Sequence, residues 1–206
     1  RRMGGALPKQ FLALAGRPLL DRTLSAAAAA GCVDAIVLAL PAGTPAESRE
    51  SYRNLPKVAA VVEGGPERQD SVRNALGAVP ADAEIVLVHD AVRPFASADL
   101  FGRCAELARA HGAAVPVIPV RDTLKTWDRS AGSLVTRDRS EFLRAQTPQG
   151  FRAGVLREAY ERAAAEARCG TDDASLVEAA GYPVFAVPGE EGNIKVTLPE
   201  DLRMAA

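Results

Sequence analysis

The sequence contains 206 residues, of which 48% are hydrophobic, 25% charged and 5% aromatic, and this length suits one globular domain with a sizeable core. Its net charge of −1 excludes nucleic-acid binding by bulk electrostatics, and no apolar run has the length of a membrane span. The three cysteines (Cys32, Cys104 and Cys169) are widely spaced without a CxxC pair, so we expect neither disulfides nor a zinc site. This cysteine usage is typical of a reducing compartment, and we expect a cytoplasmic protein.

Helix and strand patterns alternate along the chain. Residues 18–30 carry apolar side chains at helical spacing, and residues 33–40 form a continuous apolar run typical of a strand covered on both faces. The patterns that follow predict, in order, a weak helix over 44–53, a strand over 58–62, a helix from Pro66 to Leu76, a strand over 85–88, a helix capped by Ser97, and a strand over 113–120. Because this last strand contains Pro116 and Pro119, we expect it at a sheet edge or a bulge.

The pattern changes over residues 121–151, where weak alternation around Gly132 predicts a small hairpin or arm that stands off the main sheet. Two helices, over 152–168 and 172–180, and a final strand over 184–187 complete the chain. The alternation predicts an α/β fold with a Rossmann-like, open and mostly parallel sheet and helices on both faces. Ligands of such sheets bind at the carboxyl ends of the strands, so we expect the functional residues just after each strand.

The first polar cluster is the opening segment, residues 1–10. Gly4 and Gly5 lie between Arg2 and Lys9, and glycine backbone N–H groups with two fixed cations suit a polyphosphate. The alternative is a frayed terminus with solvated basic side chains.

The second cluster begins at Gly64 and Gly65 and runs to Ser71. Paired glycines at a strand-to-helix turn let a ligand approach the backbone closely. The alternative is a tight turn that needs a positive φ.

The third cluster follows the strand over 85–88 directly. Asp90 at this position is suited to hold Mg²⁺ that bridges phosphates, and the alternative is a capping or turn residue. We interpret His89 as a hydrogen-bonded core side chain, because no nucleophile lies near it in the sequence.

The fourth cluster combines the arm with residues 193–197 near the end of the chain. Arginines and threonines in the arm suit a phosphomonoester, whereas the alternative is a solvated charged face.

Taken together, these residues resemble the 2-C-methyl-D-erythritol 4-phosphate cytidylyltransferase family over essentially the whole chain. Seven motifs appear in the family's order. They are RM…PKQ at 2–10, GG-x-ER-x-DSV at 64–72, VHDA-x-RP at 88–94, PVRDT-x-K at 119–125, DR…TPQ at 138–149, TD-x-AS at 171–175 and NIKVT…PEDL at 193–202.

The resemblance implies a single nucleotidyltransferase domain over residues 1–206 that transfers CMP from CTP to 2-C-methyl-D-erythritol 4-phosphate and releases pyrophosphate. By motif position, Arg2 and Lys9 would grip the triphosphate, and Lys195 would act on the α-phosphate side. Asp90 would hold Mg²⁺, the expected cofactor. Gly65 and Ser71 would lie near the cytosine and ribose.

The resemblance also implies which residues bind the second substrate, a sugar-alcohol phosphate. These are Arg93, Thr123, Arg139 and Thr147. Family members are homodimers whose arm reaches over the partner subunit, so the arm residues would serve the neighbouring site. We therefore expect a homodimer that binds neither nucleic acid nor membranes.

The sequence departs from the family pattern in three places. The family's opening strand and glycine-rich loop are not found ahead of Arg1, and we expect a segment that precedes it. Gly192 replaces an acid that some members carry, and Pro66 follows the paired glycines. Whether a cyclodiphosphate synthase domain follows residue 206, as in some members, is left open.

Two other interpretations compete with the methylerythritol enzyme. One is a related cytidylyltransferase that acts on ribitol 5-phosphate, and the arm motifs around Asp122 and Asp138 argue against it. The other is a non-catalytic nucleotide-binding module, and the joint presence of Arg2, Lys9 and Lys195 with the acid at position 90 argues against that.

Overall fold

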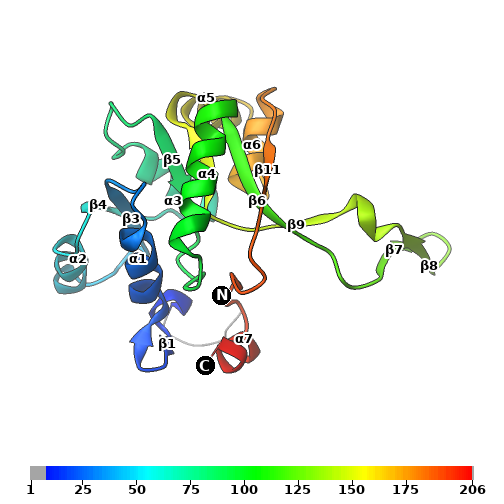
Figure 1. Ribbon diagram of the computed structural model, residues 1–206, viewed down its shortest axis with the longest axis horizontal. Helices are drawn as coiled ribbons and strands as arrows, with labels where there is room; N and C mark the ends of the chain where they lie inside the picture. Colours follow the sequence, from blue (N-terminus) through cyan, green and yellow to red (C-terminus); the bar gives the residue numbers. More distant parts are fainter. Residues whose placement is uncertain (1–7, 206) are drawn as a thin grey trace.

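The computed structural model describes residues 8–205. Strands and helices alternate along most of the chain, and a hairpin extends far from the main body (Figure 1). The elements are η1 (Lys9–Phe11), β1 (Ala13–Leu14), β2 (Arg17–Pro18), α1 (Leu19–Ala29), β3 (Ile36–Leu40), α2 (Ala46–Arg53), β4 (Val58–Glu63), α3 (Arg68–Leu76), β5 (Ile85–Val88), α4 (Ala98–His111), β6 (Ala113–Pro119), β7 (Leu124–Asp128), β8 (Ser133–Arg137), η2 (Arg139–Glu141), β9 (Leu143–Ala145), β10 (Gln149–Arg152), α5 (Ala153–Ala165), α6 (Asp173–Ala179), β11 (Phe185–Pro188) and α7 (Pro199–Ala205).

The central sheet has the strand order β11–β6–β10–β5, with β9 paired to the far end of β6. β11 is parallel to β6, and β10 is antiparallel to both β6 and β5, so β5, β6 and β11 all run in one direction. β3 and β4 form a second, parallel pair. The predicted α/β fold with a parallel-rich sheet is confirmed, and β10 is an antiparallel strand that the periodicity did not reveal.

Helices cover both faces of the central sheet, as predicted, because its strands are apolar on both sides. Val86 and Val88 of β5 pack with α5 and α6, whereas Ile85 and Leu87 pack with α4. Gly150 of β10 allows α4 to pack close, since a Cβ there would lie 2.6 Å from the Cys104 carbonyl oxygen. Within residues 8–205, no helix combines the length and apolar character needed to cross a membrane.

Two local predictions are only partly right. β6 was expected at an edge or a bulge: it lies inside the sheet, not at its edge, but its pairing is irregular where it passes from β10 to β9, opposite Pro116. β6 pairs with β10 as far as Ala114 and with β9 from Val117 onward. The opposite segment, from Ala145 to Gly150, is longer than the part of β6 between these two residues, and its extra residues form the loop that carries Thr147. Helix α3 begins at Arg68, two residues after Pro66.

The hairpin predicted around Gly132 is present: β7 and β8 pair only with each other and point away from the body (Figure 1). Every residue of β8 is exposed, and so are all but one of β7. The body resumes earlier than the predicted arm boundary at residue 151, because residues 146–150 are buried and β10 belongs to the central sheet.

Candidate active site

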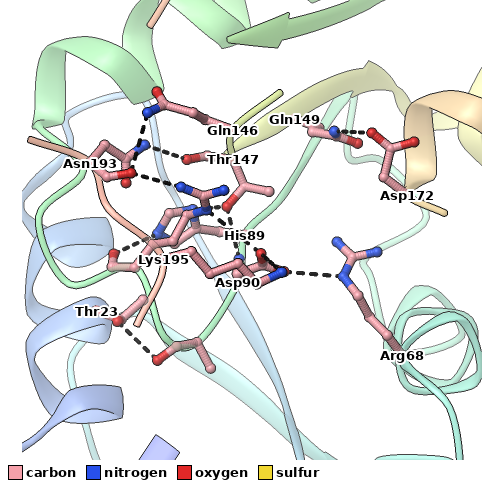
Figure 2. Close-up of polar contacts among 12 residues, drawn as sticks. Thr23, Arg68, His89, Asp90, Gln146, Thr147, Gln149, Asp172, Asn193 and Lys195 are labelled. Carbon is pink, nitrogen blue, oxygen red and sulfur yellow. Dashed lines mark hydrogen bonds and ion pairs between the residues drawn. The ribbon is translucent and has the colours of Figure 1, made fainter. Parts of the chain in front are cut away.

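Three cationic side chains surround the carboxylate of Asp90, which lies two residues beyond the end of β5 (Figure 2). Its Oδ1 is 3.1 Å from Arg68 Nε, and its Oδ2 is 2.8 Å from Lys195 Nζ and 3.6 Å from Arg93 Nε. The Asp90 side chain is only 10% exposed, so these contacts, rather than water, solvate its charge. The interpretation of Asp90 as merely a turn or capping residue is therefore insufficient.

The ionisation of the site follows from this geometry. Burial opposes the charge on Asp90, but Arg68 and Lys195 outweigh it and hold the pKa of the carboxyl below its usual range. Burial lowers the pKa of Arg93, and Asp90 opposes that change. The cluster is thus a fixed array of opposite charges with an excess of cations.

A chain of hydrogen bonds orders the loop after β5. The Asp90 backbone N–H donates to Thr147 Oγ1 over 3.1 Å, and Thr147 Oγ1 lies 2.9 Å from His89 Nδ1. His89 Nε2 lies 3.2 Å from the Arg93 carbonyl oxygen, which only accepts, so Nε2 carries the hydrogen and Nδ1 accepts from the threonine hydroxyl. Burial lowers the pKa of His89 to about 4 and keeps it neutral. His89 is a hydrogen-bonded core residue, as interpreted from the sequence.

The segment after β11 closes the site. Asn193 is fully buried; its amide donates to the Thr147 carbonyl oxygen over 2.8 Å, and its own backbone carbonyl accepts from Arg93 Nη1 over 2.7 Å. The Val196 N–H donates to the Val92 carbonyl oxygen over 2.9 Å. Lys195, between these two anchors, is held against the Asp90 loop, and this explains why a residue so late in the chain joins the site.

The glycine turn packs tightly for a reason other than a positive φ. Gly64 and Gly65 are not among the glycines with positive φ. A Cβ on Gly65 would lie 2.2 Å from Asp70 Cβ, and one on Gly64 would lie 2.9 Å from Ser71 Oγ. The Gly65 N–H donates to Ser71 Oγ over 3.1 Å. The two predicted nucleotide-side residues, Gly65 and Ser71, are therefore in contact.

Two of the predicted substrate-binding residues lie in the arm rather than in the cluster of the same chain. Thr123 and Arg139 are exposed and belong to the arm, where Arg139 donates to the Arg121 carbonyl oxygen. Lys9 lies in η1, which packs against α1, and it is half-buried. Arg2 lies outside the described residues.

Arg68 and Asp173 are members of the cluster that the sequence analysis did not single out. Arg68 Nη2 is 2.7 Å from Asp173 Oδ2, and the Tyr160 hydroxyl donates to Asp173 Oδ1 over 2.6 Å. Arg68 stands in the GG-x-ER motif, but its bridging role depends on a partner 105 positions away. No periodic pattern reveals such a pair.

The fold and the cluster together define a class of protein. Cations gathered around one ionised carboxylate, at the carboxyl ends of parallel strands in an α/β sheet, are typical of enzymes that bind phosphorylated ligands. Among residues 8–205 there is no group of three histidine, cysteine, aspartate or glutamate side chains placed to hold a metal.

Comparison with known proteins identifies the family. A sequence profile described as 2-C-methyl-D-erythritol 4-phosphate cytidylyltransferase matches residues 1–206. The chain belongs to this family, and it is a nucleotidyltransferase of isoprenoid biosynthesis that transfers CMP from CTP to 2-C-methyl-D-erythritol 4-phosphate. The family predicted from the seven motifs is thereby confirmed, and with it the methylerythritol interpretation rather than its two competitors.

Individual relatives agree with this assignment. The chain is 46% identical over 205 residues to the 2-C-methyl-D-erythritol 4-phosphate cytidylyltransferase of Symbiobacterium thermophilum, and this match covers 100% of the chain and 86% of that protein. It is 48% identical over 200 residues to the bifunctional enzyme IspD/IspF of Anaeromyxobacter dehalogenans, and this match covers 96% of the chain but only 51% of that protein. The chain therefore spans about half the length of this bifunctional relative.

Solved structures share the fold. The crystal structure of 2-C-methyl-D-erythritol 4-phosphate cytidylyltransferase from Thermus thermophilus matches with a TM-score of 0.82 and 43% identity, covering 96% of this chain and 92% of that one. The 4-diphosphocytidyl-2C-methyl-D-erythritol synthase from Anaerococcus prevotii matches with a TM-score of 0.87 and 29% identity, covering 99% and 91% of the two chains.

Proposed function

We propose that the transfer of CMP takes place at the Asp90 cluster, where the triphosphate of CTP and the phosphate of the second substrate meet. The observation that carries this proposal is the gathering of Arg68, Arg93 and Lys195 around one buried carboxylate. Two phosphorylated substrates bring several negative charges, and cations already gathered at the site favour their binding.

Catalysis in this proposal is positioning and charge neutralisation. An oxygen of the methylerythritol phosphate attacks the α-phosphorus of CTP in line, a new P–O bond forms, and the bond to the β-phosphate oxygen breaks to release pyrophosphate. Lys195 is assigned to the α-phosphate side; its side chain is 38% exposed, so its ammonium can reach a substrate phosphate while it remains near Asp90. Arg2 and Lys9 are assigned to the triphosphate by motif position.

Mg²⁺ fits this site as a metal shared between one carboxylate and the substrate. Mg²⁺ commonly binds through one or two carboxylates and completes its coordination with phosphate oxygens and water. Asp90 remains ionised and its Oδ1 and Oδ2 each already contact a cation, so the carboxylate is suited to a cationic partner. When bound, the ion supplies charge neutralisation at the phosphates and fixes their geometry.

The nucleotide side is assigned to the glycine turn. The Gly65 backbone packs directly against Asp70, where a Cβ would lie 2.2 Å from Asp70 Cβ, and its N–H donates to the Ser71 hydroxyl over 3.1 Å, so the turn and Ser71 form one unit. We assign these two residues to the cytosine and ribose.

The second substrate is assigned to residues from two subunits of a homodimer. Arg93 and Thr147 belong to the cluster, and the buried Arg93 Nε lies 3.6 Å from Asp90 Oδ2 without a hydrogen bond of its own among the described residues. The Thr147 hydroxyl holds His89 and the Asp90 N–H, so a contact with phosphate would replace its bond to His89. Thr123 and Arg139 of a second subunit's arm complete the site in this proposal.

A pyrophosphate-release assay tests the proposed function. We expect release that requires CTP, methylerythritol phosphate and a divalent cation together, and slower release with ribitol 5-phosphate. Asp90→Asn keeps the shape of the side chain but removes the charge, and it is expected to abolish most of the activity. Full activity of this variant would contradict the assignment of the site. We also assign the enzyme to the cytoplasm, since its three cysteines are free thiols.

A further inference from the structure

Arg68 uses one edge of its guanidinium to contact two different carboxylates. Nε is 3.1 Å from Asp90 Oδ1, and Nη2 is 2.7 Å from Asp173 Oδ2 (Figure 2 shows the Asp90 contact). This edge can bind both oxygens of a single carboxylate, which is the strongest arrangement available to arginine. Here each carboxylate receives only one of the two hydrogen bonds, so neither pairing is complete.

Asp173 is the buried member of this arrangement. It has no exposed surface, and besides Arg68 its carboxylate accepts a hydrogen bond from the Tyr160 hydroxyl over 2.6 Å. A buried carboxylate needs a cation to compensate for its lost hydration. Arg68 is therefore bound more firmly to Asp173 than to Asp90, whose other oxygen is already 2.8 Å from Lys195.

We propose that Arg68 is a positioning residue with two states: it is shared between Asp90 and Asp173 in the free enzyme, and it moves entirely to Asp173 when metal and nucleotide bind at Asp90. Asp173 is then the alternative anchor that makes Asp90 available. This inference rests on the proposed role of Asp90 as the metal-binding carboxylate.

The exchange has a small energetic cost because the guanidinium does not leave its partner. The hydrogen bond from Arg68 Nε to Asp90 is lost, but Nε then donates to Asp173. Asp173 thereby receives two parallel hydrogen bonds, from Nε and Nη2, and these offset the loss. The α3 backbone does not need to move, since Nη2 is already in contact with Asp173. Without Asp173, Arg68 would have Asp90 as its only carboxylate partner in this cluster and would compete with the metal.

The experiment measures binding of Mn²⁺ and CTP in the absence of methylerythritol phosphate, so that no turnover occurs. Free Mn²⁺ is followed by electron paramagnetic resonance in the native enzyme and in Asp173→Asn, Arg68→Gln and the double variant. The amide that Asp173→Asn introduces still accepts the Tyr160 hydrogen bond but no longer attracts Arg68. We expect Asp173→Asn to raise the dissociation constant about tenfold, which corresponds to one charge-assisted hydrogen bond.

The double variant distinguishes this mechanism from damage to the fold. Removing Arg68 from the Asp173→Asn enzyme removes the competitor, so Mn²⁺–CTP binding is expected to recover toward the native value. Arg73→Gln is the matched control, because Arg73 lies on the same helix and pairs with Asp70 at the surface. Urea unfolding of each variant confirms that it is folded.

The outcomes separate the two proposals. Native affinity in Asp173→Asn would overturn the two-state role of Arg68, and so would a double variant that binds as weakly as Asp173→Asn. Asp90→Asn is measured alongside: if it binds Mn²⁺–CTP as tightly as the native enzyme, the proposed function of Asp90 fails instead. Weakening in Asp173→Asn with recovery in the double variant supports the inference.

Discussion

The Asp90 cluster and the arm both carry cationic and hydroxyl side chains suited to phosphate, yet they are built in opposite ways. In the cluster, Asp90, Arg93 and Thr147 are each at most about a tenth exposed and every one has a polar partner in the same chain. In the arm, Thr123 and Arg139 are exposed.

This difference shows how the two regions acquire function. The cluster is ordered by the sheet, by a neutral histidine and by a fully buried asparagine, so its geometry exists before any ligand binds. The β7–β8 hairpin of the arm pairs within itself and presents apolar side chains to solvent, among them Trp127 and Leu134 at 65% and 66% exposure. We infer that the arm residues contribute to a site only after this surface meets another subunit.

The largest effect is expected inside the cluster. Lys195→Ala removes an ammonium proposed to act at the transition state, and a loss of about 10²–10³-fold in kcat is expected for such a preorganised electrostatic contact. The fold should survive, because the side chain is 38% exposed. Steady-state kinetics measure the change, and Lys57→Ala, which removes a lysine bonded to the Ala30 carbonyl, is the control. A kcat equal to the native value would remove Lys195 from the mechanism.

A second test concerns the stability of the cluster against acid. His89 has a pKa of about 4 when folded and an ordinary value of 6.5, so the unfolded chain binds a proton that the native state excludes. Stability therefore falls as the pH drops from 6.5 to 4, by up to about 3 kcal/mol from this group.

Urea unfolding between about pH 4.5 and 8 measures this dependence, since the range spans the ordinary pKa of histidine. His89→Gln is expected to be less stable at neutral pH but to lose the part of the slope that His89 causes. If the unfolding free energy of His89→Gln depends on pH as steeply as that of the native protein, a group other than His89 causes the pH dependence.

A third test concerns the exposed arm. Trp127→Ser removes a large apolar side chain whose ring also contacts the Arg129 guanidinium, 5.1 Å from its centre. If the arm forms the dimer interface, the dimer dissociation constant should rise by about 30-fold, as for an aromatic interface anchor worth about 2 kcal/mol. Sedimentation equilibrium measures it, with Leu55→Ser, an exposed leucine of the body, as the control. An unchanged dissociation constant would exclude Trp127 from the interface.

The sequence predicted much of this molecule because the relevant signals are local. The apolar run of β5, the Ser97 cap of α4 and the Gly132 hairpin are each defined by neighbouring residues, and all are present. Asp90 was found because a residue just after a buried strand is placed at the sheet's ligand-binding edge.

What sequence reasoning missed depends on distant contacts. The sequence showed Arg68 only as part of a motif, because the carboxylates it joins lie 22 and 105 positions away. β6 was expected at an edge or a bulge because proline lacks an N–H, and the irregular pairing opposite Pro116 tolerates a proline inside the sheet. A positive φ was one explanation for the glycines of the 64–65 turn, whereas tight packing against Asp70 and Ser71 requires them.

The central claim, that each active site combines the body of one subunit with the arm of another, is tested most directly by mixing two inactive variants. Lys195→Ala inactivates the body's cluster, and Arg139→Ala inactivates the arm. Heterodimers purified through two different tags contain one site in which both residues are native, so they are expected to recover about half of the native activity. If the arm serves its own subunit, both sites carry a defect and the heterodimer stays inactive, which would contradict the account.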